Sequence, residues 1–398
     1  MTFEPNPEEP TTRAPRRRRA TLAGGAALTA AAVAAAIALA VAPGGRAPTR
    51  VGSTAGRVTS ATCSGPTGAA YVAEPGYQAF GAIDTSDCSL VQTYNVDDAP
   101  VPGFPDDLNY GGTDEGEALA GNLLFFAVTG QSNVAVIDTQ TLDPSNYSPP
   151  EKLIPVGLFP QAVAVRPGGK QAWVADTGPQ TSPDSPSGIS VISTASRRVT
   201  AKLPLAGQPN FLAFSPSGDR AYVTTNDGLA VYDTASERLV TTVTGLGQPH
   251  GVAVSPDGNL VYVAESSRNR LAVIDAATDR VVGTVKVGDL PWQVAVSKDG
   301  RTVYVADPDS DAVSMVSAST RKLVHTISVT GGPDTLALTP DGSELWVGDM
   351  TSGYVTVLDA GTGALVGDVN LGGSEPQSGD GLEPTDIVLT TTPTPSGS

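Results

Sequence analysis

Residues 249–265 read Pro-His-Gly-Val-Ala-Val-Ser-Pro-Asp-Gly-Asn-Leu-Val-Tyr-Val-Ala-Glu, and this stretch decides the fold. Apolar residues alternate with others on both sides of Ser255-Pro-Asp-Gly, and alternation over about 4–8 residues is typical of a β-strand. Asp-Gly between two such runs is a strong signal for a tight hairpin turn. The stretch therefore predicts two antiparallel strands joined by a short turn.

The same pattern returns along the chain. Pro209, Pro249, Pro291 and Pro333 are separated by 40, 42 and 42 residues, and Pro160 lies 49 residues before Pro209. A hairpin follows each proline, and further strands follow the hairpin, as in Leu271–Asp275 and Arg280–Val285. Four strands in about 42 residues predict one blade of a β-propeller.

Counting the repeats predicts seven blades. Five begin at the prolines named above, and a sixth lies in 117–157. The repeat at 70–96 lacks an inner strand, whereas 384–390 is an inner strand with nothing after it. Pairing these two halves would complete one blade and cover an exposed sheet edge. The predicted fold class is therefore an all-β, seven-bladed propeller of four-stranded antiparallel blades over 67–392, closed by the C-terminal strand.

The motifs of this repeat resemble those of the YVTN-type β-propeller family, which includes YncE-like proteins. The residues that carry the resemblance are Ser255-Pro-Asp-Gly, Tyr262-Val-Ala and Val273-Ile-Asp-Ala-Ala-Thr. The family's Thr-Asn after Tyr-Val is mostly replaced here by Ala followed by Asp or Glu. No Trp-Asp dipeptide occurs, which disfavours the WD40 branch.

Composition excludes several functions. The 398 residues include 24 Lys and Arg against 41 Asp and Glu, and this net charge of −17 would repel nucleic acid. Only two His and two Cys occur, which leaves no more than the four ligands of a single Cys/His zinc site. No Walker A, dinucleotide-binding or Gly-x-Ser-x-Gly motif is present, so no cofactor is expected beyond a divalent cation.

The N-terminus has the pattern of a targeting segment. A basic region at 1–19 ends in four arginines, Arg16–Arg19, and 20–42 contains no charged residue. A helix of this length could span a bilayer, with the arginines on the cytoplasmic side. A cleaved signal and a retained anchor both remain open, and either one predicts an extracytoplasmic propeller, secreted or anchored by 20–42. Residues 43–66 read as a flexible linker, and 393–398 as a disordered tail.

The two cysteines are expected to form a disulfide. Cys63 precedes the second strand of the split blade, and Cys88 lies in the turn between its third and fourth strands. In a four-stranded antiparallel blade these two connections emerge on the same face. An exported protein occupies a compartment that permits disulfides.

Long connections and carboxylates point to one face of the ring. Residues 97–116, 177–188 and 374–383 are longer than the repeat requires, and all three are expected on the face where the inner strands begin. Only 143–151 is expected on the other face. Cross-strand pairing should place His250 opposite Glu265, and Asp334 opposite Asp349, at about 5 Å between Cβ atoms. The predicted ligand-binding face contains Glu74, Asp176, His250, Glu265, Trp292, Asp307, Asp334 and Asp349.

This face suggests binding, with two alternatives. Its carboxylates match a cation or a small cationic ligand, and Glu265, Asp307 and Asp349 are the candidate metal ligands. Capping of strand ends by turn hydrogen bonds is the competing explanation for the same residues. We expect a monomeric module that binds an extracytoplasmic protein or a small ligand. His250 and Glu265 also resemble the acid–base pair of streptogramin lyase-like enzymes, which leaves a lyase- or lactonase-like activity with a divalent cation open. A subunit resembling the amine dehydrogenase heavy chain is the third possibility.

Overall fold

The computed structural model describes residues 68–74, 79–95, 116–142, 152–178, 187–349, 351, 353–371 and 386–391. The chain divides into two compact units, Met1–Ser53 and Thr54–Ser398, and every described residue belongs to the second. The predicted basic region, the signal or anchor at 20–42, the linker and the C-terminal tail lie outside the described residues and stay predictions. Among the described residues, no helix has the length and apolar character that a membrane span requires.

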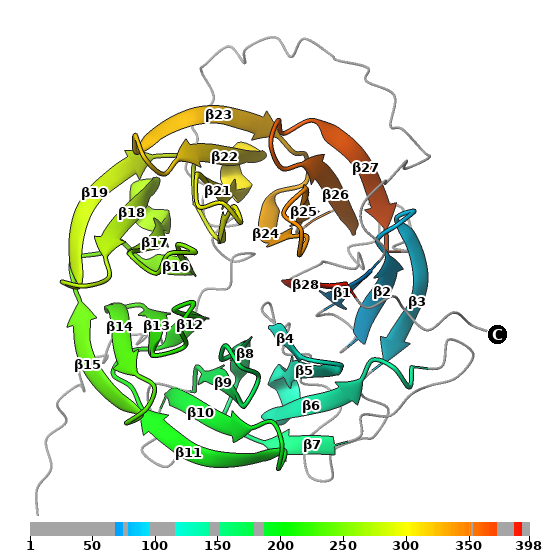
Figure 1. The fold of residues 1–398 in the computed structure, drawn as a ribbon, viewed down its shortest axis with the longest axis vertical. Helices are drawn as coiled ribbons and strands as arrows, with labels where there is room; N and C mark the ends of the chain where they lie inside the picture. The colour runs from blue at the N-terminus through cyan, green and yellow to red at the C-terminus, as the bar shows by residue number, and fades with distance from the viewer. Residues whose placement is uncertain are drawn as a thin grey trace, which may run out of the picture. The chain divides into compact units, whose positions relative to one another are not determined.

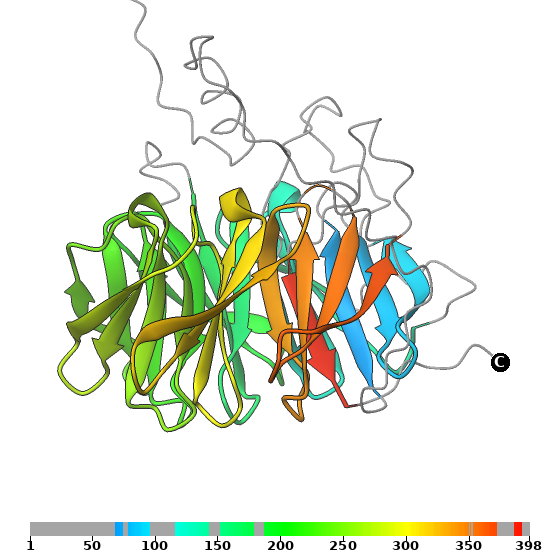
Figure 2. The same ribbon diagram turned by 90° about the horizontal axis from the view of Figure 1, so that it is seen from above.

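The described strands form seven four-stranded antiparallel sheets arranged as blades around a central axis (Figure 1; Figure 2). This confirms the predicted all-β, seven-bladed propeller. In blades 2–7 the strand order follows the sequence from the axis outward, whereas blade 1 combines the last strand with the first three.

The strand bounds follow the predicted repeat. Blade 1 contains β28 (Asp386–Thr390), β1 (Ala69–Glu74), β2 (Ala79–Asp84) and β3 (Ser89–Asn95). Blade 2 contains β4 (Glu117–Ala120), β5 (Leu123–Val128), β6 (Asn133–Asp138) and β7 (Lys152–Pro155). Blade 3 contains β8 (Pro160–Val165), β9 (Gln171–Asp176), β10 (Gly188–Ser193) and β11 (Arg198–Pro204). Blade 4 contains β12 (Pro209–Phe214), β13 (Arg220–Thr225), β14 (Gly228–Asp233) and β15 (Arg238–Val243).

The remaining blades continue the series. Blade 5 contains β16 (Pro249–Val254), β17 (Leu260–Glu265), β18 (Arg270–Asp275) and β19 (Arg280–Lys286). Blade 6 contains β20 (Val294–Val296), β21 (Thr302–Asp307), β22 (Ala312–Ser317) and β23 (Lys322–Ser328). Blade 7 contains β24 (Pro333–Leu338), β25 (Glu344–Asp349), β26 (Tyr354–Asp359) and β27 (Leu365–Asn370). Single 3-10 turns follow the second strands of blades 2, 5 and 6: η2 (Thr129–Gln131), η3 (Ser266–Arg268) and η4 (Pro308–Ser310).

The hairpin turn has the conformation that its sequence predicts. Gly258 has a φ of 73°, a left-handed conformation that glycine adopts without strain. Ser255 Oγ donates to Asp257 Oδ1 at 2.6 Å and accepts the N–H of Leu260 at 2.9 Å. These bonds satisfy the polar groups of the turn locally, which fixes the register of the two strands that it joins.

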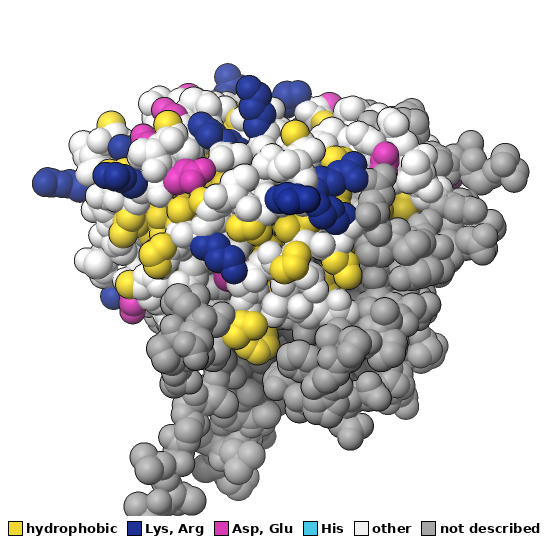
Figure 3. All heavy atoms as spheres, turned by 90° about the horizontal axis from the view of Figure 1, so that it is seen from below, with side chains coloured by type: hydrophobic (Ala, Val, Ile, Leu, Met, Phe, Trp, Pro, Cys, Tyr) yellow, Lys and Arg dark blue, Asp and Glu magenta, His cyan; other side chains and the backbone are white. Residues whose placement is uncertain are grey.

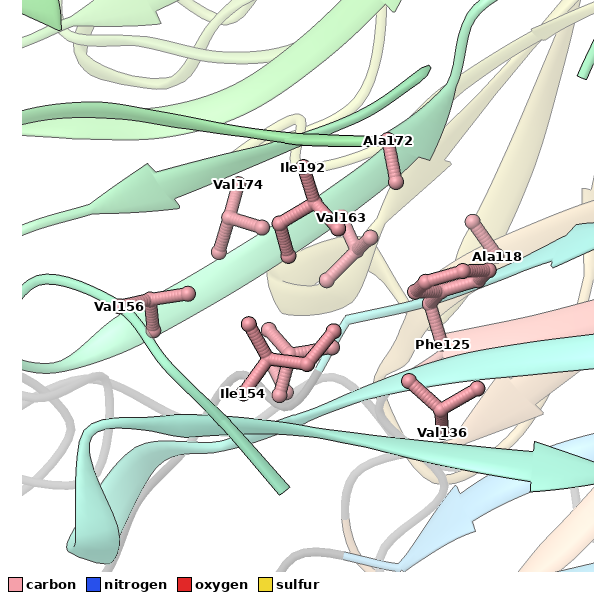
Figure 4. Close-up of a cluster of buried hydrophobic side chains, with 11 residues drawn as sticks. Ala118, Phe125, Val136, Ile154, Val156, Val163, Ala172, Val174 and Ile192 are labelled. Carbon is pink, nitrogen blue, oxygen red and sulfur yellow. The ribbon is translucent and has the colours of Figure 1, made fainter. Parts of the chain in front are cut away.

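Packing between blades forms the core. Seven clusters of buried apolar side chains each join two neighbouring blades. Figure 4 shows the cluster in which Phe125 and Ile154 of blade 2 meet Val163 and Ile192 of blade 3. The third residue of every second strand is a buried aromatic that belongs to one of these clusters: Tyr71, Phe125, Trp173, Tyr222, Tyr262, Tyr304 and Trp346.

The C-terminal strand lies beside the first blade. β28 pairs antiparallel with β1, from Ala69 opposite Thr390 to Ala73 opposite Asp386. Ile387 of β28 also packs in the cluster between blades 7 and 1, together with Trp346 and Val72. Two kinds of contact therefore attach this strand to the ring: a backbone ladder and apolar packing.

If β28 closes the ring, a chain that ends before Asp386 should lose a large part of its stability. The truncation would expose the inner edge of β1 and remove Ile387 from the cluster between blades 7 and 1. We expect a fall in melting temperature or aggregation, measured by thermal unfolding and size-exclusion chromatography. A chain ending after Thr391 is the control and should melt like the parent; equal melting of both truncations would contradict the closing role of β28.

Candidate functional site

The inner strands begin beside the ends of the second strands, and a β-bulge interrupts their pairing there. On the hairpin side Val254 pairs with Val261, as predicted. At the other end Pro249, not His250, lies opposite Glu265. The predicted pairs at this end were therefore wrong by one residue. The same shift separates Gln161 from Asp176, Asn210 from Thr225, and Asp334 from Asp349. In blade 6, β20 begins only at Val294, so Trp292 precedes the strand and has no ladder partner in Asp307.

Neighbouring inner strands also contact each other near the axis. The N–H of Gly251 donates to the carbonyl of Trp292 in the next blade at 2.7 Å. Gly116 donates in the same way to the carbonyl of Gln161, also at 2.7 Å. A Cβ on Gly251 would lie 2.5 Å from the Trp292 carbonyl oxygen, so only glycine allows this approach. Hairpin patterning does not reveal such contacts between blades.

The carboxylates at the ends of the second strands are buried and fasten adjacent loops. Asp176 Oδ1 accepts the N–H of Gly157 at 2.9 Å, and Glu265 Oε2 accepts that of Gly247 at 2.8 Å. Both glycines lie in the loop that leads into the inner strand of the same blade. A Cβ on Gly331 would likewise lie 2.7 Å from Asp349 Cγ. These contacts support the capping explanation for this set of residues.

Glu265 is held by two arginines. Arg270 Nε donates to Oε1 at 2.9 Å, and Arg268 Nη1 donates to Oε2 at 2.9 Å. Arg270 Nη2 also reaches Oε2, at 3.0 Å. Both carboxylate oxygens therefore have charged donors, and in the described part of the chain no hydrogen bond joins Glu265 to His250.

Asp176 and Asp307 each accept a hydroxyl hydrogen bond in the blade interior. Ser190 Oγ donates to Asp176 at 2.5 Å, and Ser314 Oγ donates to Asp307 at 2.6 Å. Burial is the main cause that raises the pKa of each carboxyl group to about 6.

The described residues contain no group of three His, Cys, Asp or Glu side chains that could hold a metal ion. The candidate metal ligands Glu265, Asp307 and Asp349 end the second strands of three different blades and are not brought together as such a group. Glu74 ends β1, as the repeat predicts.

His250 and Trp292 form an aromatic stack at this end of the ring. Their ring centroids are 3.8 Å apart with an interplanar angle of 26°. Burial lowers the pKa of His250 to about 4, so the imidazole is neutral at pH 7. Trp173 and Trp346, by contrast, are fully buried between blades. Trp292 is therefore the one tryptophan of three that lies near the axis and is partly exposed.

A second polar cluster near the axis was missed by the sequence reasoning. Asp386 Oδ2 accepts the N–H of Glu117 at 2.9 Å, and the side chain of Gln293 also hydrogen-bonds to Asp386. Gln293 Oε1 accepts the N–H of Leu336, so this side chain links blades 6, 7 and 1. Burial raises the pKa of Asp386 to about 6. The signal available in the sequence was a carboxylate inside an otherwise apolar inner strand.

Two of the predicted long connections, 97–116 and 374–383, fall largely outside the described residues, as does most of 177–188. The strands that flank them are described. Each connection joins a fourth strand to the next inner strand, or a second strand to a third. By antiparallel topology these strand ends lie at the end of the ring that contains His250 and Trp292. The roles predicted for the connections themselves stay predictions.

Comparison with known proteins supports a propeller repeat. An NHL repeat model matches 246–274, which covers most of blade 5. A chain of Kuenenia stuttgartiensis hydrazine synthase is similar in structure, with a TM-score of 0.61 and 18% identity over 77% of this chain and 99% of that one. A functionally unknown protein from Desulfotomaculum acetoxidans is also similar, with a TM-score of 0.62 and 17% identity over 82% and 99% of the two chains. No curated protein matches at the sequence level. At these identities the likeness concerns the fold alone, and membership of a propeller repeat family is supported without the narrower YVTN assignment.

Replacing Glu265 by glutamine should destabilise the fold. Glutamine keeps the size of the side chain but leaves two arginines and the Gly247 N–H without their charged acceptor, at a cost of about 2–4 kcal/mol. The free energy of unfolding by urea measures this. Asp309→Asn is the control, because Asp309 is exposed in the equivalent loop of blade 6, and it should change stability by less than about 0.5 kcal/mol. Parent-like stability of Glu265→Gln would show that the carboxylate is not a cap.

The fluorescence of Trp292 should report the protonation of His250. A protonated imidazole quenches indole emission more than a neutral one, so emission should fall through a transition near pH 4, well below the usual histidine value of about 6.5. Because the folded pKa is the lower one, the neutral ring stabilises the fold above about pH 6.5, and this contribution is lost as the pH falls toward 4. Circular dichroism would separate quenching from unfolding. In His250→Gln the transition should disappear; a midpoint between pH 6 and 7 would contradict the lowered pKa of His250.

Proposed function

We propose that this chain is an extracytoplasmic β-propeller that binds a protein or a small ligand where its inner strands begin, without chemistry of its own. One observation carries the proposal. In five of the seven blades a proline stands at or shortly before the start of the inner strand, and the residue after it differs each time: Gln161, Asn210, His250, Trp292 and Asp334. The prolines before these residues repeat from blade to blade. A purely structural requirement would act on all blades alike, so this variation favours recognition of an asymmetric partner.

The chemistry of these side chains favours a neutral ligand over a small cation. Asn210 Nδ2 donates to the Pro249 carbonyl at 3.0 Å, and Gln161 Oε1 accepts from Thr177 at 2.7 Å. The imidazole of His250 is uncharged at pH 7, whereas the carboxylates that would attract a cation are buried as caps. A partner with hydrogen-bonding groups and a flat apolar face therefore fits better than the cationic ligand expected from sequence.

Export is part of the same proposal. The arginines at 16–19 and the uncharged segment at 20–42 support transport across the cytoplasmic membrane, with the propeller secreted or anchored outside. Cys88 is buried between blades 7 and 1, and the described residues include no free cysteine. Its expected partner, Cys63, lies outside them, so the disulfide is proposed here on the topology of the blade. We also take β28 as the strand that closes a monomeric ring.

No observation favours an enzyme. A lyase- or lactonase-like activity would need His250 and Glu265 as an acid–base pair, but Glu265 is bonded to Arg268 and Arg270. A subunit resembling the amine dehydrogenase heavy chain would need a cofactor-bearing partner. The likeness to a hydrazine synthase chain is a likeness of fold and carries no reaction.

A thermal-shift screen tests the proposal. The full chain would be screened with neutral saccharides, quaternary ammonium ions, Ca²⁺ and Mg²⁺, the metals with and without chelator. A ligand at about 100 times its Kd stabilises the folded state by about 2.7 kcal/mol, which is readily measured. We expect a neutral compound to raise the melting temperature of the parent and to lose this effect in Trp292→Leu. Lys298→Ala, at the hairpin end of blade 6, is the control and should respond like the parent.

Two outcomes would count against the proposal. A shift that survives in both Trp292→Leu and His250→Gln would place binding elsewhere. A shift caused only by Ca²⁺ or Mg²⁺ and removed by chelator would favour the cation expected from sequence.

A further inference from the structure

The outermost strands of three consecutive blades begin with a cation and two exposed apolar residues. The triplets are Arg238-Leu239-Val240 in blade 4, Arg280-Val281-Val282 in blade 5 and Lys322-Leu323-Val324 in blade 6, each 42 residues after the one before. All nine side chains are exposed, and the third valines are 52%, 41% and 68% exposed. We call these nine residues the outer belt.

A β-bulge turns the third residue of each triplet outward. In blade 6 Val316 pairs with Leu323 and Met315 with His325, which leaves Val324 between them. Val240 and Val282 occupy the same place in blades 4 and 5. Bulges protect the edges of sheets from pairing with other strands, and equivalent shifts in blades 1, 3 and 7 show that this bulge belongs to the fold.

The fold does not require the cation at the start of the bulged strand, because some blades lack it. Blades 3–6 have Arg198, Arg238, Arg280 and Lys322 at this position, whereas blades 1 and 7 have Ser89 and Ala364. Protection of the sheet edge therefore explains the bulge but not the four consecutive cations. A polar residue at the bulge would protect the edge better than an exposed valine does.

The outermost strands of these blades are basic in an acidic protein, although Arg238 and Arg280 lie opposite Asp233 and Asp275 of the adjacent strands. The outermost strands of blades 2–6 contain no Asp or Glu, although the chain has 41 of them. Their cations are Lys152, Arg198, Lys202, Arg238, Arg280, Lys286 and Lys322. Figure 3 looks at the side of the ring that contains β7, β11 and β15, and it shows Lys and Arg side chains interspersed with hydrophobic ones and with a few carboxylates. Within the described ranges, the ion pairs involve Arg220, Arg268, Arg270 and Arg301, and none involves a cation of the outer belt.

The geometry of the ring decides which kind of partner fits. Seven blades turn by about 51° from one to the next, so the three triplets face directions that span roughly 100°. A flat bilayer would meet only one or two of them. An extended chain that follows the rim would meet all three, with its carboxylates near the cations and its apolar side chains on the exposed valines and leucines.

We propose that the outer belt binds an extended acidic segment of a partner protein, in which carboxylates and apolar side chains take turns at every second residue and so share the face that meets the ring. The bulges interrupt the backbone ladder, so recognition uses side chains and not the addition of a fifth strand. Because the cations are exposed, the attraction should be sensitive to salt. This surface is separate from the site proposed around His250 and Trp292.

A labelled peptide tests the proposal on the full chain. The probe is a fluorescein-labelled peptide of Glu-Ser-Val-Ser repeats, about 12 residues long, which places Glu and Val on one face and extends over roughly 40 Å. Fluorescence anisotropy should show saturable binding at about 50 mM NaCl that weakens at about 300 mM. Arg238→Glu/Arg280→Glu/Lys322→Glu should weaken binding at least about tenfold. Val240→Ser/Val282→Ser/Val324→Ser should also weaken it while keeping the salt dependence.

The matched control separates the belt from net charge. Lys170→Glu/Lys298→Glu/Arg301→Glu makes the same change in charge at exposed turns between first and second strands, and it should bind the peptide within about threefold of the parent. Trp292→Leu should bind the peptide like the parent. A failure of peptide binding is therefore distinguishable from a failure of the function proposed around His250 and Trp292. Absence of binding to the parent, or equal losses in the belt and control variants, would overturn the proposal. Belt-dependent binding to phosphatidylserine vesicles without binding to the peptide would overturn it in favour of a membrane.

Discussion

The fold depends on the packing of one aromatic side chain per blade against the next blade. A four-stranded sheet on its own exposes both faces, and the blades bury theirs only against each other. Tyr304 shows how specific the contact is: its ring packs in the cluster between blades 6 and 7, and its hydroxyl donates to the Ala360 carbonyl at 2.6 Å. Removing such a side chain would cost about 3–5 kcal/mol, and in a ring each interface also fixes the angle of the next.

Much of this could be predicted from the sequence, because the repeat is local. Ser255-Pro-Asp-Gly fixes its hairpin through bonds inside the turn, so the pairing of Val254 with Val261 follows from the residues themselves. The pairing of Pro249 with Glu265 does not, because a bulge shifts the register before it, and the same shift occurs in blades 3, 4 and 7. The alternation of apolar residues predicts the paired stretch beside the turn but gives no sign of this extra residue.

The carboxylates end the second strands as predicted, and their hydrogen bonds fit the capping explanation that the sequence left open beside ligand binding. At the end of a second strand, an Asp or Glu can line a channel mouth or cap the loop beside it, and the two possibilities have the same spacing. What separates them is burial and the donors nearby, such as Gly157 N–H for Asp176. A native pKa of about 6 for Asp176, Asp307 and Asp386 means that ionisation opposes folding as the pH rises from about 4 to 6. The hydrogen bonds that these carboxylates accept from backbone N–H groups offset this cost in free energy.

Comparison of blades within the chain separates structural from functional residues. Three features recur around most of the ring, as expected of features that each interface needs. They are the buried aromatic residue at the third position of the second strand, the proline before the inner strand and the bulge in the outermost strand. Departures from the repeat are of two kinds. The residue after the proline differs in each of five blades, whereas the outer cation recurs in only four consecutive blades. Neither pattern follows from the geometry of the ring, which is the same for every blade. The two proposals, one partner bound at the axis and another along the rim, would account for both patterns by an asymmetric demand from outside the fold.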